Sequence, residues 1–124
     1  MRICVDLDGV ICELRRGDQK YEDLQPMVGA REKLTMLREA GNYIIIHTAR
    51  RMRTHHGDVE KVKEDIGQST IEWLARHHIP YDEIHFGKPW AQVYIDDNAY
   101  RFDGWCQIQD NGSSLPPSNE SRLK

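Results

Sequence analysis

Two aspartates near the N-terminus have the type and spacing of a site for a cation or a phosphate. Asp6 and Asp8 follow the apolar run at residues 3–5 and precede Gly9. Side chains two positions apart in a strand project to the same side, so both carboxylates are expected to point together from the strand's end. Like charges held that close repel each other unless a cation or a shared proton lies between them. The pair therefore indicates a divalent-metal or phosphate site, with an ordinary surface pair at a turn as the alternative.

Other polar residues stand at or just after the ends of later apolar runs. They are Thr48, Lys88, Asp96 and Asp97. If those runs are parallel strands, ligands bind beyond their carboxyl ends, and these side chains would converge with the two N-terminal aspartates on one rim. Carboxylates combined with a phosphate suit Mg²⁺. A hydroxyl and an ammonium group can hold the oxygens of a phosphoryl group. The set therefore predicts chemistry on a phosphate.

The elements that would position these residues alternate along the chain. We predict strands from residue 3 to the first aspartates and at 43–47, 82–86 and 92–95, an edge strand at 105–108, and helices at 26–40 and 59–78. We predict that residues 10–25 form a short flap or hairpin over the end of the first strand. Strands that alternate with helices predict an α/β fold, a Rossmann-like doubly wound parallel sheet. Apolar strands without alternation are typical of parallel sheets that are covered on both faces.

The composition is that of a soluble globular protein. The chain has 124 residues, of which 39% are hydrophobic and 30% charged, and a net charge of −3, so we expect no nucleic-acid or membrane partner. No apolar run approaches the roughly 20 residues that span a bilayer. The three cysteines lack metal-type spacing and predict reduced thiols in a cytoplasmic protein. We predict one domain at residues 1–109 and a polar, flexible tail at 110–124.

The ordered set resembles the four motifs of the haloacid dehalogenase (HAD) superfamily. The resemblance covers about residues 1–101 and rests on Asp6-Leu7-Asp8-Gly9-Val10, Thr48, Lys88-Pro89 and Ile95-Asp96-Asp97. Taken singly, the later motifs are also typical of a strand end, a surface lysine and a turn. Their joint order favours the HAD reading, which implies a HAD-type fold and an Mg²⁺-dependent phosphatase.

The resemblance implies a role for each of these side chains. Asp6 would attack phosphorus and form an aspartyl-phosphate, and Asp8 would protonate the leaving oxygen and then deprotonate the hydrolytic water. Thr48 and Lys88 would hold the transferring phosphoryl group. The Mg²⁺ ligands would come from Asp6, Asp8, Asp96 and Asp97. An acid at the second position of the first motif points to a phosphatase within the superfamily.

The chain leaves no room for a cap domain, so the site is expected to be open. The basic loop after Thr48 carries Arg50, Arg51 and Arg53, three arginines that could bind a second anionic group or the hydroxyls of a sugar, with a solvated loop as the alternative. Of these, Arg50 and Arg53 are predicted to bind substrate. Gly9 is predicted to let the backbone turn tightly beside the phosphate. The capless frame resembles phosphatases of capsule or polysaccharide biosynthesis. That resemblance implies a small phosphorylated substrate, such as a sugar phosphate or sugar-derived intermediate. An open site also leaves room for a partner chain in a homo-oligomer.

Two other readings stay open. A catalytically idle HAD-like domain would serve as a binding or assembly piece. A response-regulator receiver also combines an acid pair, a threonine and a Lys-Pro pair on a small parallel sheet. In a receiver, however, the acceptor aspartate follows the third strand, whereas here that strand is followed by Gly87-Lys88-Pro89.

Overall fold

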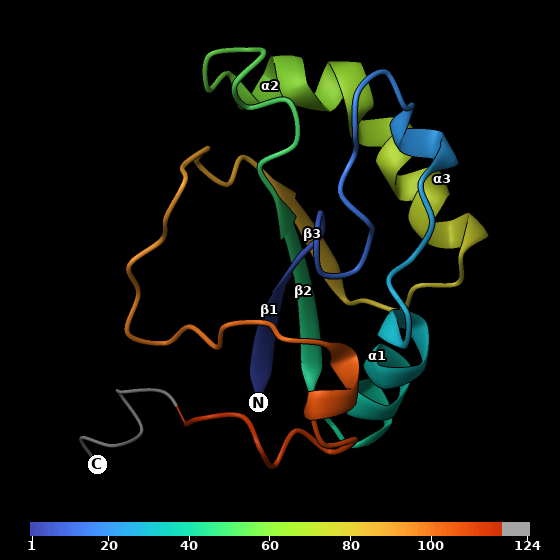
Figure 1. Ribbon diagram of the computed structural model, residues 1–124, viewed down its shortest axis with the longest axis vertical. Helices are drawn as coiled ribbons and strands as arrows, with labels where there is room; N and C mark the ends of the chain where they lie inside the picture. The colour runs from blue at the N-terminus through green and yellow to red at the C-terminus, as the bar shows by residue number, and fades with distance from the viewer. Residues whose placement is uncertain (118–124) are drawn as a thin grey trace.

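The computed structural model describes residues 1–117 and shows an α/β fold built on a three-stranded parallel sheet (Figure 1). The strands are β1 (Arg2–Asp6), β2 (Tyr43–Thr48) and β3 (Glu83–Phe86), in the order β1-β2-β3. Asp6 is aligned with His47 in the register of β1 and β2. The carboxyl ends of all three strands therefore lie at one edge of the sheet, and the predicted parallel α/β fold is confirmed.

The helices follow β1 and β2. α1 spans Ala30–Glu39. After β2, one helical run contains α2 (Val59–Val62), a π-helical turn (Lys63–Gly67) and α3 (Gln68–Arg76). The predicted helix is thus confirmed, and Gly67 ends the π turn that interrupts it. In the described part of the chain, no helix is long and apolar enough to cross a membrane.

The first helix begins later than the sequence predicts. Pro26, the predicted start, pairs with Cys12 in an isolated bridge that ties down the end of the flap. The helix starts at Ala30, after Gly29 with φ 84°. A Cβ on Gly29 would lie 3.3 Å from the Cβ of Trp105, a tight contact, so the close approach of the C-terminal segment also favours glycine here.

One face of the sheet carries the main hydrophobic core. Val5, Ile44 and Ile46 are buried on this face with side chains of α1 and α3. Figure 1 shows both helices on the same side of the sheet. On the other face Cys4 is exposed and His47 is half-buried. The predicted coverage of both faces is therefore wrong for the described chain. Right-handed crossovers that run in one direction along a sheet put their helices on one face.

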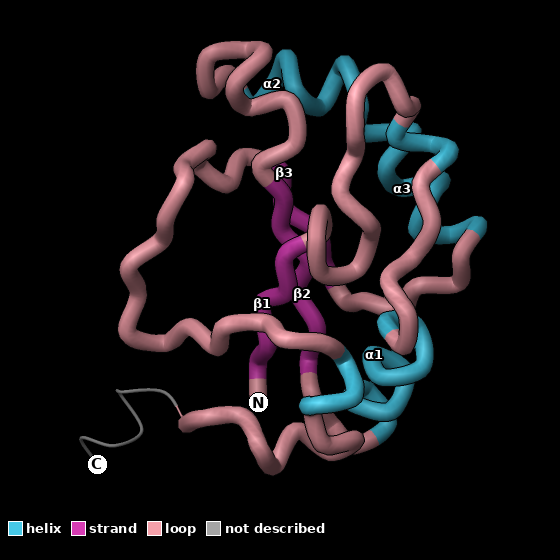
Figure 2. The backbone as a smooth tube through the Cα atoms, viewed as in Figure 1, coloured by secondary structure: helices cyan, strands magenta, loops and turns pink. Residues whose placement is uncertain are grey.

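The predicted fourth strand at residues 92–95 is also wrong. The chain after β3 arches away from the sheet as irregular structure (Figure 2). Val93 is 72% and Ile95 is 99% exposed. A turn directly after the short apolar run competes with strand formation. In this turn the Asn98 N–H donates to the carboxylate of Asp96 at 2.7 Å. Within the described chain, β1 pairs only with β2, so its other edge is open.

Residues 105–108 do not form the predicted edge strand. A 3₁₀ turn at Trp105–Gln107 replaces it. Trp105 is buried in the main core, and its indole N–H donates to the carbonyl of Val10 at 2.7 Å. The burial of Trp105 therefore determines the local structure. The alternation of apolar and polar residues in the sequence does not reveal this contact.

The packed part of the chain extends past the predicted domain boundary at residue 109. The Lys33 ammonium pairs with the Asp110 carboxylate at 2.6 Å, and Leu115 packs against the main core. The first residues of the predicted tail therefore contact the domain, and their flexibility stays a prediction. The remainder of that prediction, at residues 118–124, lies outside the described chain.

Candidate active site

Four of the predicted site residues meet beyond the carboxyl ends of the strands. The Lys88 Nζ lies 3.5 Å from Asp6 Oδ2, and the Thr48 hydroxyl donates to Asp8 Oδ2 at 3.3 Å. Asp6, Asp8 and Lys88 line an open pocket of about 480 Å³. The structure therefore brings together the carboxylates, the hydroxyl and the ammonium group.

A tight turn after β1 fixes the two aspartates. The Leu7 N–H donates both to the Asp6 carboxylate at 3.0 Å and to the His47 carbonyl at 3.1 Å. Gly9 has φ +89°, and its N–H donates to the Cys12 carbonyl at 2.7 Å. The tight turn predicted at Gly9 is therefore confirmed, while its contact with substrate stays a prediction.

Lys88 is positioned by a glycine at the end of β3. Gly87 has φ +104°, and a Cβ on it would lie 2.9 Å from the Cγ2 of Val59. The Lys88 N–H donates to the Thr48 carbonyl at 3.1 Å, which holds the lysine beside β2. Its ammonium group lies 4.1 Å from the centre of the Tyr94 ring. Backbone conformation and close packing therefore both require glycine before the lysine.

Replacement of Gly87 by alanine is expected to lower the free energy of unfolding by about 2–3 kcal/mol, because positive-φ strain and overpacking against Val59 add together. Gly41 is the matched control, since it has φ +97° but no atom within 4 Å of an added Cβ. Gly41→Ala should cost only about 1 kcal/mol. Urea unfolding measures both, and equal losses would contradict the close packing described at Gly87.

The Arg50 side chain is buried at the site and bound to Asp8, which the sequence alone does not reveal. Its side chain is 1% exposed, and its Nη2 and Nε donate to the Asp8 carboxylate at 2.8 and 3.2 Å. Nη1 donates to the Thr70 hydroxyl at 3.1 Å, and the guanidinium lies 4.1 Å from the centre of the Tyr21 ring. In this structure Arg50 therefore holds Asp8, and its predicted contact with substrate stays untested.

Two neighbouring titratable groups are kept neutral by their surroundings. Burial lowers the pKa of His47, and the positive charge of Lys88 lowers it further. Burial raises the pKa of the Cys12 thiol to about 12, against the opposing effect of Arg50. Cys12 therefore stays a thiol near neutral pH and is no nucleophile.

The structure does not bring Asp96 and Asp97 to the two N-terminal aspartates. Both are exposed in the irregular segment after β3, and neither lines the pocket. Among the described residues, no group of three or more His, Cys, Asp or Glu side chains is placed to hold a metal ion. The convergence that the sequence predicts for all four aspartates fails because the strand that would carry the second pair does not form.

Several pocket residues escape the sequence analysis. Arg53, which is predicted to bind substrate, lines the pocket together with Arg51 and Thr54 of the same basic loop. The lining residues that the sequence analysis does not single out include Arg15, Tyr21, Trp90 and Tyr94. The flap at 10–25 supplies the first two of the added residues. Its predicted place over the end of the first strand is the signal that could have identified them.

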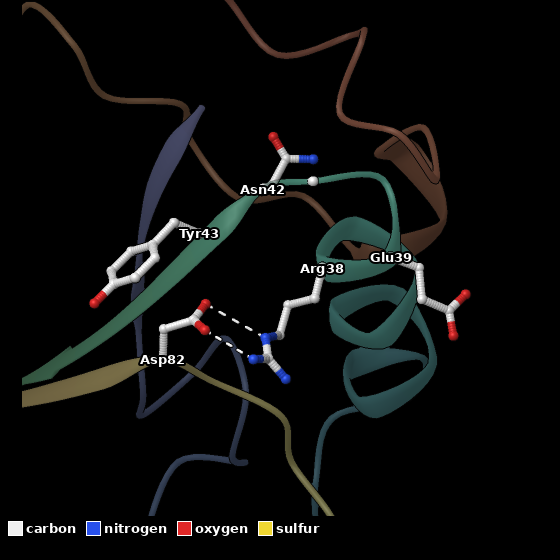
Figure 3. A pocket seen from close by; sticks show the side chains of 6 residues that line it. Arg38, Glu39, Asn42, Tyr43 and Asp82 are labelled. Atoms are coloured by element: carbon white, nitrogen blue, oxygen red, sulfur yellow. Dashed lines mark hydrogen bonds and ion pairs between the residues drawn. The ribbon is translucent and has the colours of Figure 1, made fainter.

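A second pocket lies at the opposite end of the sheet. Figure 3 shows the Arg38 guanidinium pointing at the Asp82 carboxylate, with the shorter contact at 2.7 Å. The same carboxylate accepts the N–H of Ile44 at 2.7 Å. These bonds join the end of α1 to the start of β2 and β3, so the pair is structural.

Comparison with known proteins gives a structural relative. The crystal structure of an MCSG target from Vibrio cholerae has 40% sequence identity and a TM-score of 0.74, and the match covers 81% of this chain and 82% of that chain. The protein-family models and the curated proteins give no match. The chain therefore belongs to the same protein family as this Vibrio cholerae protein.

Proposed function

We propose that the protein is a HAD-type phosphomonoester hydrolase that works through an aspartyl-phosphate on Asp6, on a phosphorylated sugar or sugar-derived intermediate. The observation that carries the proposal is the contact between Lys88 and Asp6 at the wall of an open, basic pocket. A carboxylate oxygen can attack phosphorus, while a neighbouring ammonium group neutralises charge on the phosphoryl oxygens.

In the first step, an Asp6 oxygen attacks phosphorus and the bond from phosphorus to the ester oxygen breaks. In its acid form, Asp8 delivers a proton to that leaving oxygen, which departs as an alcohol, and Asp8 is left as the carboxylate that pairs with Arg50. Lys88 and Thr48 bind the oxygens of the phosphoryl group during transfer. Lys88 lies 3.5 Å from Asp6 and Thr48 lies 3.3 Å from Asp8, so both side chains are close to where the charged phosphoryl oxygens would lie.

In the second step, water attacks the phosphorus of the aspartyl-phosphate and gives a proton to Asp8. The bond from phosphorus to Asp6 breaks, so phosphate leaves and both carboxyl groups return to their starting state. Arg50 keeps Asp8 oriented, since its guanidinium reaches both carboxylate oxygens.

The donor set on the rim fits Mg²⁺. This cation prefers one or two carboxylates together with water and substrate phosphate oxygens, and does not need a cage of protein ligands. Asp6 and Asp8 would supply the protein oxygens. When bound, the cation would neutralise negative charge where the carboxylates and the phosphate meet.

The experiment that tests the proposal is to trap the intermediate. The protein is mixed with Mg²⁺ and p-nitrophenyl phosphate, quenched in acid, digested with trypsin and analysed by fragmentation mass spectrometry. We expect one phosphoryl group on Asp6 in the peptide at residues 3–15. The Asp6→Asn variant should carry none, and a phosphoryl group on another residue would contradict the assignment.

The metal-binding role predicted for Asp96 and Asp97 requires their segment to lie closer to Asp6 than it does here. The segment is free of core packing at Val93 and Ile95, which are 72% and 99% exposed. If the prediction holds, Asp97→Asn should raise the Mg²⁺ concentration needed for half-maximal activity about tenfold or more. Loss of a residue that only supports a metal ligand already lowers metal affinity by about that factor.

The same titration is made with Asp96→Asn, and Asp103→Asn is the control. Asp103 is an exposed acid in the same irregular segment. Unchanged Mg²⁺ activation in both aspartate variants would show that the first pair of carboxylates is sufficient.

A further inference from the structure

We propose that the pocket beside Asp6 selects phosphorylated sugars that carry a second anionic group, a carboxylate or a second phosphate. Arg15, Arg51 and Arg53 bind this second group. The inference rests on the proposed function and narrows its substrate class.

The charge of the pocket exceeds what one phosphate needs. Its lining contains five cationic side chains, those of Arg15, Arg50, Arg51, Arg53 and Lys88, and two carboxylates. Two of the cations are already paired, one with each carboxylate. Arg15, Arg51 and Arg53 have no carboxylate partner within the pocket lining, although Arg51 lies 3.7 Å from the Asp65 carboxylate outside it, in a protein whose net charge is −3. Such a local excess attracts a ligand with more negative charge than a single phosphomonoester.

Aromatic rings hold two of these arginines in place. The Arg53 guanidinium lies 4.8 Å from the centre of the Trp90 ring, and Trp90 is 49% exposed. The Arg15 guanidinium lies 5.2 Å from the centre of the Tyr21 ring and donates to the carbonyl of Gly17 at 2.9 Å. Arginines stacked on rings lose less freedom on binding an anion.

Arg51 is strained and incompletely hydrogen-bonded. Its φ is 60°, in the left-handed region that a side chain disfavours. Its Nε is buried with no hydrogen-bond partner, and the nearest carboxylate oxygen, on Asp65, lies 3.7 Å away. A strained backbone at a pocket wall is typical of a functional site.

The loop that carries Arg51 and Arg53 is anchored to the protein. Met52, between them, is buried in a small cluster with Val62 and Ile66 of the helical run. Its N–H and carbonyl close the loop through bonds of 3.0 and 2.9 Å. The arginines are therefore presented by fixed backbone, and an anion that binds there does not have to order the loop.

The test compares matched substrates in the presence of Mg²⁺. Glucose 1-phosphate is paired with glucuronic acid 1-phosphate, and fructose 6-phosphate with fructose 1,6-bisphosphate. We expect kcat/KM to be about tenfold or more higher for the member with two anionic groups in at least one pair. The reason is that only the second anionic group can form charged hydrogen bonds to these three arginines. The pair that shows the preference identifies the anion as carboxylate or phosphate.

Arginine variants locate the preference. Arg53→Gln and Arg15→Gln should each reduce the ratio of the two kcat/KM values several-fold. Arg31→Gln is the control, because Arg31 is exposed, pairs with its neighbour Glu32 and lies outside the pocket. A ratio that survives both pocket variants overturns the assignment of the second group to these arginines.

Binding to Asp6→Asn separates this inference from the proposed function. Isothermal titration with the same four sugar phosphates needs no turnover. If wild-type protein hydrolyses no phosphate ester but the variant still binds the sugars with two anionic groups more tightly, only the proposed function fails. Equal affinities within both pairs, together with equal kcat/KM values, overturn the second-anion site even in an active phosphatase.

Discussion

Replacement of Asp6 by asparagine is expected to lower kcat for phosphate release about 10⁴-fold or more, since loss of a nucleophile removes the covalent route. An amide oxygen is a poor nucleophile toward phosphorus and carries no charge to pair with Lys88. The measurement is steady-state release of inorganic phosphate from p-nitrophenyl phosphate with Mg²⁺.

The fold should survive this substitution. Asp6 accepts one hydrogen bond from the Leu7 N–H, which an amide oxygen can also accept. Asp18→Asn in the exposed flap is the matched control and should keep full activity. Unchanged turnover in a folded Asp6→Asn protein would contradict the role assigned to Asp6.

Replacement of Arg50 by methionine should lower the free energy of unfolding by about 3 kcal/mol, the lower end of what breaking a buried ion pair costs. The lower end applies because the side chain of Asp8 is 23% exposed, whereas that of Arg50 is 1% exposed. The loss leaves Asp8 without its bidentate partner. Urea unfolding gives the value.

Turnover of Arg50→Met should fall with its stability, because Asp8 is no longer oriented. Arg50→Lys should recover little, since lysine cannot bind a carboxylate in bidentate fashion. Arg53→Met, from the exposed part of the same loop, should change stability by less than about 0.5 kcal/mol. Equal stabilities of the Arg50 and Arg53 variants would contradict the buried pair.

The parallel sheet and most of the rim follow from local sequence patterns. Apolar runs give β2 and β3, and the polar residues after them predict where Thr48 and Lys88 lie. The signal holds for β2 because Ile44 and Ile46 are buried there, whereas β3 has no buried residue. Gly87 and Gly9 are also explained by backbone conformations that only glycine adopts easily.

The rest depends on contacts between distant residues. Residues 92–95 have the composition of a strand, but strand formation requires burial against a neighbour, and Ile95 is 99% exposed. The role of Arg50 depends on Thr70 and Tyr21, which are far away in the chain. Contacts between residues so far apart in the chain leave no periodic pattern in the sequence. The sequence of a basic loop therefore does not distinguish an arginine that is buried from one that is exposed.

The central claim is multiple-turnover hydrolysis at Asp6, and the most direct measurement is the amount of phosphate released per protein molecule. Wild-type protein with Mg²⁺ and excess p-nitrophenyl phosphate should release phosphate linearly over many equivalents. At most one equivalent, with a stable phosphorylated protein, would indicate a receiver-type acceptor. No release and no phosphorylation would indicate an idle binding domain, and either result would contradict the account.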